Sequence, residues 1–220
     1  MGNRSSSSSS SSEIKVALIG LTETGKSHFL GVVGDAVLPS HPTHGTEEIT
    51  ITHGKQQLRF TELGACIGES WAALFEARKF DCVMWFIDQH DTFEEICEGR
   101  NRLLHAVVPS SSSAPHTKTF RQIPLCIIQN RGRSLEQRRS VEKIVTSRGN
   151  RSKYVWLDLN PAAEGSSSSN GGVSWERLPS IINIDHLSSV HTGVYLTQLS
   201  YTDDYALNQL LDWIVASSSE

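Results

Sequence analysis

The stretch EIKVALIGLTETGKS, residues 13–27, joins a short apolar run to a loop that is bounded by glycines and ends in Lys26 and Ser27. The run 13–20 is nearly continuous in apolar residues, which is typical of a strand buried on both faces of a parallel sheet. The residues from Lys26 to about Val37 predict a helix. The stretch therefore predicts a strand–loop–helix unit at the start of an α/β domain.

The loop GLTETGKS, residues 20–27, matches the phosphate-binding pattern G-x-x-x-x-G-K-[ST] in full and in the required context. Backbone N–H groups of such a loop surround phosphate oxygens, and the helix N-terminus adds partial positive charge. Lys26 is expected to reach the β- and γ-phosphates, and Ser27 to ligate Mg²⁺. A glycine-rich turn with a chance Lys-Ser is the alternative, but the flanking strand and helix favour nucleotide binding. The predicted phosphate-binding residues are Gly20, Thr22, Glu23, Thr24, Gly25, Lys26 and Ser27.

The rest of the chain continues the α/β pattern. Residues 47–54 alternate with period two and predict a strand, and residues 55–63 predict its hairpin partner, with the turn near Gly54. Apolar runs predict strands at 80–88, 123–130 and 193–200, and helical spacing predicts helices at 92–108, 134–145 and 205–215. The fold class is therefore α/β, a six-stranded mostly parallel sheet flanked by helices on both faces. A ligand of such a sheet sits outside the carboxyl ends of the strands.

The length of 220 residues predicts one domain. This domain spans residues 13–216, between a serine-rich tail at 1–12 and a short tail at 217–220. Serine runs, of which Ser5–Ser12 is the longest, bury too little apolar surface to order, so we expect them to be disordered. The periodic pattern breaks down at about 149–191, which predicts an irregular insertion.

Composition excludes several classes of function. A net charge of −4 with mixed signs gives no nucleic-acid footprint. The four cysteines form no C-x-x-C pair, which argues against a zinc site or a disulfide framework and indicates a reducing compartment. No apolar run reaches the length of a membrane span.

Two short motifs indicate a family. PTHG (42–45) precedes the second predicted strand, and ELGA (62–65) ends the third. With the early phosphate loop, the start MGN and the late LLDWI (210–214), they make the chain resemble the Arf and Arf-like small GTPases. In that family P-T-x-G precedes the second strand and W-D-x-G-G-Q ends the third. The resemblance covers residues 13–216 and implies the P-loop NTPase fold of a small GTPase, with GTP or GDP and Mg²⁺ as cofactors.

The resemblance assigns roles by position. Thr43 would ligate Mg²⁺ through its hydroxyl, and Glu62 would hold it through a water. The N–H of Gly64 would contact the γ-phosphate, which is how a small GTPase orders its switch segments. These segments would be residues 43–52, the first switch segment, and residues 62–75, the second, and effector proteins would bind them. The implied metal ligands are therefore Ser27, Thr43 and Glu62.

The sequence departs from the family at two places. Cys66 occupies the position of the glutamine that orients the attacking water, so we expect very slow hydrolysis and name no catalytic residue. After the strand 123–130 the family has N-K-x-D. Here Asn130 and Arg131 can still contact the base, but Arg133 replaces the aspartate that accepts from guanine. Ser200 and Tyr201 align with the last base-binding element.

Two functional hypotheses follow. The first is an atypical Arf-like GTP-binding protein that acts as a nucleotide-dependent regulatory switch, with slow intrinsic hydrolysis, in membrane traffic. The alternative is a pseudo-GTPase, an interaction or scaffold module with weak or relaxed nucleotide binding. Cys66 and Arg133 favour the alternative, whereas Lys26, Ser27 and Thr43 argue against it.

The N-terminus bears on localisation. MGNRSS places Gly2 and Ser6 as in an N-myristoylation signal, and a disordered tail that merely begins with glycine is an equal alternative. One acyl chain would give only weak, reversible membrane contact. We expect a cytoplasmic monomer that binds guanine nucleotide and effector proteins and contacts membranes peripherally if Gly2 is acylated.

Overall fold

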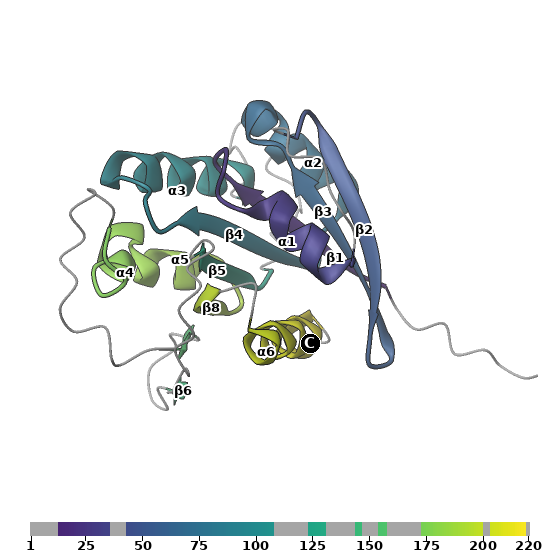
Figure 1. Ribbon diagram of the computed structural model, residues 1–220. Coiled ribbons are helices and arrows are strands. Elements are labelled where there is room, and N and C mark those ends of the chain that lie inside the picture. The colour runs from purple at the N-terminus through teal and green to yellow at the C-terminus, as the bar shows by residue number, and fades with distance from the viewer. Residues whose placement is uncertain are drawn as a thin grey trace, which may run out of the picture.

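The computed structural model describes residues 13–35, 43–107, 123–130, 144–146, 154–157, 173–199 and 203–218. These residues form one twisted sheet with helices on both faces (Figure 1). The strands are β1 (Glu13–Gly20), β2 (Thr46–His53), β3 (Gln56–Leu63), β4 (Cys82–Asp88), β5 (Leu125–Asn130), β6 (Ile144–Thr146), β7 (Tyr154–Leu157) and β8 (Val194–Leu199). The helices are α1 (Lys26–Val33), η1 (Ala65–Ser70), α2 (Trp71–Arg78), α3 (Phe93–Val107), α4 (Leu178–Ile182), α5 (Ile184–Val190) and α6 (Asp204–Ser218).

The strand order in the sheet is β2-β3-β1-β4-β5-β8-β7-β6. Neighbouring strands are parallel except for β2, which is antiparallel to β3, and β6, which is antiparallel to β7. The first six strands in this order are those that the sequence predicts, so the mostly parallel six-stranded sheet is confirmed. The strands β7 and β6 extend it beyond β8.

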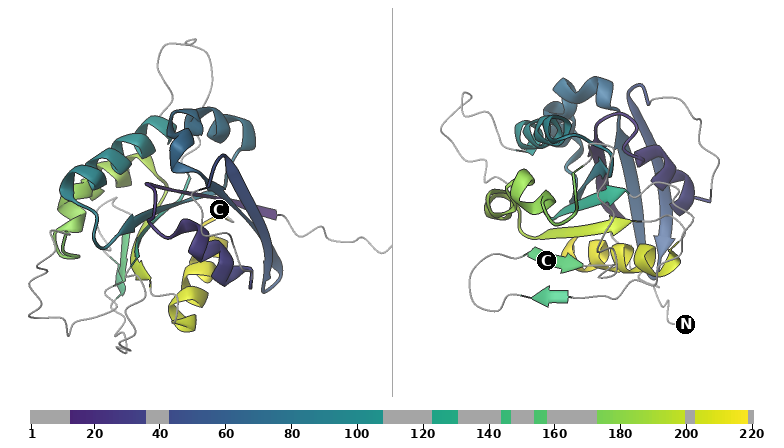
Figure 2. Two further views of the ribbon diagram at one scale, coloured as in Figure 1. Left: turned by 45° about the horizontal axis from the view of Figure 1, so that its top comes forward. Right: turned by 60° about the vertical axis from the view of Figure 1, so that its left-hand side comes forward.

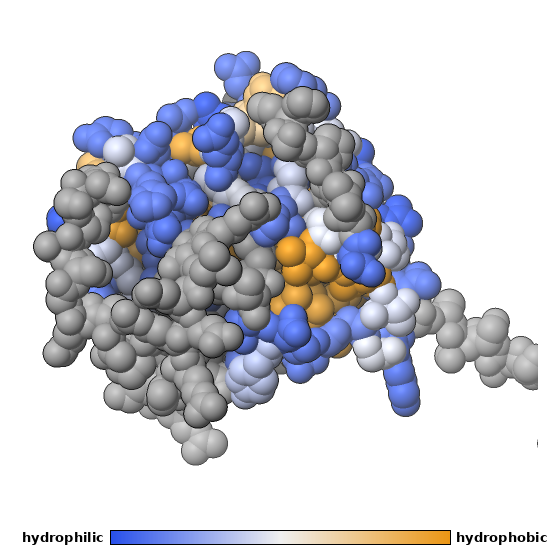
Figure 3. All heavy atoms as spheres, viewed as in Figure 1, coloured by the Kyte–Doolittle hydropathy of each residue, from blue (hydrophilic) through white to orange (hydrophobic). Residues whose placement is uncertain are grey.

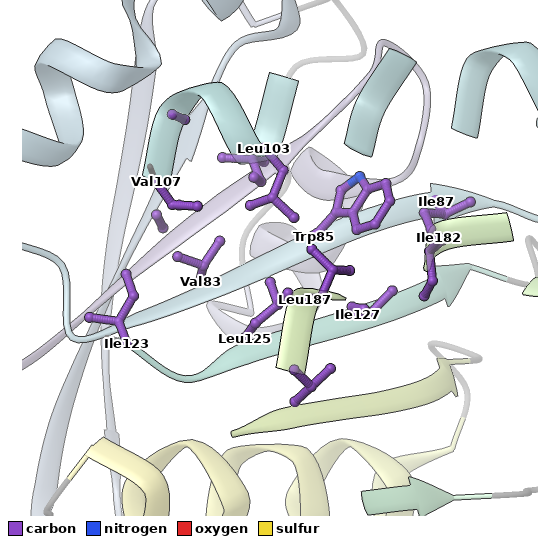
Figure 4. Close-up of a cluster of buried hydrophobic side chains, with 14 of the residues drawn as sticks. Val83, Trp85, Ile87, Leu103, Val107, Ile123, Leu125, Ile127, Ile182 and Leu187 are labelled. Carbon is purple, nitrogen blue, oxygen red and sulfur yellow. The ribbon is translucent and has the colours of Figure 1, made fainter. Parts of the chain in front are cut away.

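Two apolar cores lie on opposite faces of the sheet. Successive side chains of a strand point to opposite faces, so β4 contributes Val83, Trp85 and Ile87 to one core and Cys82, Met84 and Phe86 to the other. The first core packs under α2, α3, α4 and α5, and Figure 4 shows its central side chains. The second packs under α1 and α6, and Figure 2 shows this pair on the face opposite α2 and α3.

Among the coloured residues of Figure 3, hydrophilic ones predominate, and the largest apolar patch lies over α1 and β2. Half-buried apolar side chains that pack against the second core in this region are Val33, Ile49 and Ile51. Ile49 also lies against the end of α1, because a Cβ at Gly34 would come 1.7 Å from its Cδ1. The hairpin β2–β3 therefore packs directly against α1.

Several boundaries differ from the sequence prediction. The first helix ends at Val33 and not near Val37. Ile144 and Val145, expected at the end of a helix, lie in strand β6, while residues 134–143 of that predicted helix lie outside the described residues. The helix α6 continues to Ser218, two residues into the expected tail.

The segment 149–191 was expected to be irregular, but it contains β7, α4 and α5. The two helices are ordered by burial of Leu178, Ile182 and Leu187 in the first core. A backbone carbonyl of α4, at Ile181, also accepts a hydrogen bond of 3.2 Å from Nη1 of Arg100. Each helix spans seven residues or fewer, which is too short to show a clear helical period in the sequence.

His191 is a buried titratable group at the end of the sheet opposite the phosphate loop, just before β8. Its Nδ1 lies 2.8 Å from the carbonyl oxygen of Ile123, and because a carbonyl only accepts, Nδ1 carries the proton. Its buried Nε2 has no hydrogen-bond partner among the described residues. Burial lowers the pKa of His191 from 6.5 to about 4.

The buried imidazole makes the protein sensitive to acid. Below about pH 6.5 the unfolded chain binds a proton that the folded chain refuses until about pH 4, so stability falls as the pH falls through this window. From about pH 7 to about pH 5 we expect this group alone to cost about 2 kcal/mol of unfolding free energy. Urea denaturation of His191→Gln should lack this part of the loss, because glutamine does not titrate between about pH 5 and pH 7. Its amide N–H can still donate to the carbonyl oxygen of Ile123. The variant His186→Gln, at an exposed site, should lose stability as the wild type does.

Candidate nucleotide-binding site

The loop between β1 and α1 has the conformation that its glycines permit. Gly20 has φ +150°, and a Cβ there would come 2.5 Å from the carbonyl oxygen of Phe86. Gly25 has φ 93° and precedes the first turn of α1, where its carbonyl accepts a 2.9 Å hydrogen bond from the N–H of Phe29. An L side chain fits neither position without strain. The loop therefore brings bare backbone to the N-terminus of α1, which is the arrangement that binds anions.

Lys26 lies beneath this loop with 4% of its surface exposed. Its ammonium donates to the carbonyl oxygens of Leu21 at 2.6 Å and Gly20 at 3.1 Å. Burial lowers the pKa of Lys26 to about 8, and the negative charges of Glu62 and Asp91 oppose this shift. An anion held by the loop would offset the same desolvation cost.

Asp91 is a residue of this region whose contribution the sequence analysis missed. It follows β4, and its carboxylate accepts a 2.8 Å hydrogen bond from the N–H of Asp88. Burial raises the pKa of Asp91 to about 6, and the charge on Lys26 opposes the rise. Asp91 is far from the phosphate loop in the sequence, so the sequence does not show that it lies near Lys26. The two segments meet because each follows a parallel strand, β4 or β1, that ends at the same edge of the sheet.

The three predicted metal ligands come together. The hydroxyl of Ser27 donates to Oε1 of Glu62 at 3.0 Å and lies 3.3 Å from Oγ1 of Thr43. Glu62 and Thr43 are 2% and 8% exposed. Oε2 of Glu62 is buried without a hydrogen-bond partner among the described residues. Two hydroxyls and a carboxylate with a free oxygen form an oxygen set that suits Mg²⁺, so these residues fit the ion.

A second carboxylate, which sequence reasoning missed, lies beside this set. Glu47 on β2 pairs directly with Glu62 on β3. Burial raises the pKa of Glu47, and the charge of Glu62 adds to the rise. The signal was present in the sequence, because a hairpin that turns at Gly54 places these two glutamates opposite each other.

The two switch segments contact each other. The N–H of Gly64 donates to the carbonyl oxygen of Gly45 at 2.9 Å. Cys66 is exposed, and its Sγ lies 3.5 Å from the carbonyl oxygen of Thr43 and 3.8 Å from Nδ1 of His44. A buried indole N–H of Trp71 donates to the carbonyl oxygen of Gly64 at 3.1 Å, which anchors the second segment.

The predicted base-binding residues are only partly described. Asn130 ends β5, is 5% exposed, and donates through Nδ2 to the carbonyl oxygen of Thr24 at 3.3 Å. This bond ties the end of β5 to the phosphate loop. Thr24 is itself buried, whereas Thr22 and Glu23 are exposed. The remaining residues predicted to contact or discriminate the base, Arg131, Arg133, Ser200 and Tyr201, lie outside the described residues.

In the described part of the chain, His, Cys, Asp and Glu side chains form no group of three or more that could hold a metal ion, so a cation here would rely on hydroxyl or phosphate oxygens as well. None of the described helices has the length and apolar character needed to cross a bilayer.

Comparison with known proteins supports the fold. No protein-family model and no curated protein matches the sequence. Among solved structures, the small GTPase Arl6 from Trypanosoma brucei, bound to the nucleotide analogue GppNp, superposes with a TM-score of 0.61 at 13% identity, over 94% of this chain and 98% of that one. The mammalian SRP receptor superposes with a TM-score of 0.57 at 11% identity, over 91% and 99%. The chain therefore has the P-loop fold of a small GTPase, as the sequence predicts.

The close contact between the switch segments predicts a steric effect. A Cβ at Gly64 would come 2.2 Å from the carbonyl oxygen of Thr43, so Gly64→Ala must push the backbone of the first switch segment away. We expect a loss of about 1–3 kcal/mol of unfolding free energy in urea, with faster exchange of the residue 64 amide, whose N–H donates to Gly45 in the wild type.

Gly68→Ala is the matched control. There the Cβ would meet the flexible side chain of Arg102 at 2.9 Å, so the cost should stay below about 1 kcal/mol. Equal losses in the two variants would contradict the close approach of the switch segments.

Proposed function

We propose that this protein is an Arf-like small GTP-binding protein that acts as a nucleotide-dependent regulatory switch. The observation that carries the proposal is the meeting of Ser27, Thr43 and Glu62 next to the loop that buries Lys26. These residues come from three separate segments of the chain, and each stands at a position to which the Arf-like resemblance assigns a metal ligand. Mg²⁺ held by this set would neutralise charge between the β- and γ-phosphates of GTP.

The conformational part of the proposal rests on the two switch segments. Gly64 is the position expected to contact the γ-phosphate and Thr43 the position expected to ligate Mg²⁺, and their segments already touch through Gly45 and Cys66. A γ-phosphate at Gly64, together with Mg²⁺ at Thr43, would change how the two segments contact each other. Effector proteins that recognise residues 43–52 and 62–75 would then distinguish GTP from GDP.

Guanine is the base we propose, with weakened discrimination. Asn130 ends β5 and is bonded to the phosphate loop, which supports a base site at this place. Arg133 offers only donors where guanine needs an acceptor, so selectivity over adenine should be low. Within the family, E-L-G-A-C (62–66) and R-L-P-S-I-I (177–182) resemble the atypical ADP-ribosylation factor-like protein 16.

We further propose a cytoplasmic monomer that takes part in membrane traffic. Its support is the family resemblance and the MGN start, because an acyl chain on Gly2 would supply weak, reversible membrane contact. Residues 1–12 lie outside the described residues.

A scaffold function with weak nucleotide occupancy is the second candidate. It is favoured by internal bonds that already occupy nucleotide-facing groups. The Lys26 ammonium is bonded to Gly20 and Leu21, and the Gly64 N–H to Gly45. Binding a phosphate would exchange these bonds for others and so reduce the net gain.

Nucleotide binding is tested by mass spectrometry of the purified full-length protein. We expect bound GDP or GTP in the wild type, none in Lys26→Ala, and wild-type occupancy in Lys55→Ala, a control at the exposed hairpin turn. Titration with labelled GDP, GTP, ADP and ATP then measures base preference. A wild type that carries no nucleotide and binds none in the titration would support the scaffold function, and tighter binding of adenine nucleotides would contradict guanine recognition.

Hydrolysis is the second property to test. The Cys66 thiol is a weak hydrogen-bond partner and too short to orient a water, so single-turnover GTP hydrolysis with Mg²⁺ should be very slow. Cys66→Gln should raise the rate at least about tenfold, whereas Cys97→Ser on α3 should leave it unchanged. A wild-type rate as high as that of an Arf-family protein with its activator would refute the expectation.

A further inference from the structure

Glu47 and Glu62 occupy directly opposite positions on the antiparallel strands β2 and β3. Directly opposite residues point to the same face of a sheet, with Cβ atoms about 4.5–5.5 Å apart. On β2, Ile49 shares this face and packs against the second core with Phe60 of β3. Glu48 points the other way, where it pairs with Arg78. The two glutamates therefore lie side by side on the α1 face.

Both glutamates have a buried oxygen to spare. Oε2 of Glu47 and Oε2 of Glu62 are buried and have no hydrogen-bond partner among the described residues. Neither carboxylate forms an ion pair there, since the described ion pairs join other residues. Buried polar atoms without partners are costly, and two adjacent ones of the same charge are more so. A bound cation would satisfy both oxygens at once.

Two hydroxyls complete the set. Ser27 Oγ lies 3.0 Å from Oε1 of Glu62 and 3.3 Å from Oγ1 of Thr43. The four groups come from α1, the residues before β2, β2 itself and β3. Each of them can ligate a metal ion through oxygen. Such a set suits hard divalent cations such as Mg²⁺, Mn²⁺ and Ca²⁺, and it contains no nitrogen or sulfur to favour zinc.

We propose that Glu47 joins Glu62, Ser27 and Thr43 in a site that binds a hard divalent cation before any nucleotide is present. The site shares three residues with the proposed nucleotide site, and so rests in part on the proposed function. Glu47 is the addition, because its carboxylate supplies negative charge that would otherwise come from phosphate oxygens. The cation would link β2 and β3 to the first turn of α1 and order the site for a nucleotide.

The test is direct titration of Mn²⁺ into full-length protein stripped of nucleotide. Electron paramagnetic resonance measures the concentration of free Mn²⁺ at each step of the titration. We expect one bound Mn²⁺ per chain, displaced by Mg²⁺. Glu47→Gln and Glu62→Gln should each weaken binding at least about tenfold. Glu48→Gln is the matched control, since it removes a carboxylate one residue away on the opposite face, and it should bind as the wild type does.

Further variants and measurements keep the outcomes distinct. Lys26→Ala should abolish nucleotide binding but still bind Mn²⁺. The cation site can therefore be tested even if the protein binds no nucleotide. If Glu47→Gln does not fold, Glu47→Asp replaces it as a variant that keeps the charge but shortens the side chain, and it should bind Mn²⁺ more weakly than the wild type. In addition, the wild type should melt at a higher temperature with Mn²⁺ than with chelator. Absence of Mn²⁺ binding to the stripped wild type, or equal affinity of Glu47→Gln and Glu48→Gln, overturns the proposal.

Discussion

The parallel pairing of β1 with β3 is the constraint on which the candidate site depends. Its register places Leu18 opposite Glu62, so the loop that follows β1 begins beside the end of β3. The Ser27 hydroxyl can then donate to Glu62 across 3.0 Å, which links the first turn of α1 to the sheet. Because β3 continues from β2 through a hairpin, the same alignment brings Glu47 to this face. Backbone ladders therefore position the acidic groups, while the loop positions the lysine.

The parts of the site that the sequence predicts are those that a local pattern specifies. The motif at 20–27 requires glycines at particular backbone angles, and Gly20 and Gly25 have positive φ values. Thr43 and Glu62 follow from short motifs at strand ends, and both lie within reach of Ser27. The hairpin turns at Gly54 as the sequence predicts, and its register pairs Phe60 with Ile49 and Leu58 with Ile51 on one face.

What the sequence does not reveal depends on contacts between distant segments. Asp91 acts on Lys26 because β1 and β4 are parallel neighbours, which no local pattern states. Glu47 follows the motif PTHG (42–45) closely but is not part of it. Its partner Glu62 is therefore shown only by the register of the two strands. The helices α4 and α5 are short and follow a serine-rich stretch, and they are held by burial in the first core rather than by helical propensity.

Burial of charge makes the site costly to fold and responsive to ligands. The pKa of Lys26, lowered to about 8, reflects part of the free-energy cost of burying its charge. A ligand of opposite charge would offset this cost and so stabilise the folded protein when it binds. The N–H of Gly64 is already bonded to Gly45, and one donor cannot serve two acceptors at full strength. On the proposed function, a γ-phosphate that takes this N–H would therefore release Gly45 from its partner. Since Gly45 leads directly into β2, the release would reach the edge of the sheet, which lies in the segment proposed to bind effectors.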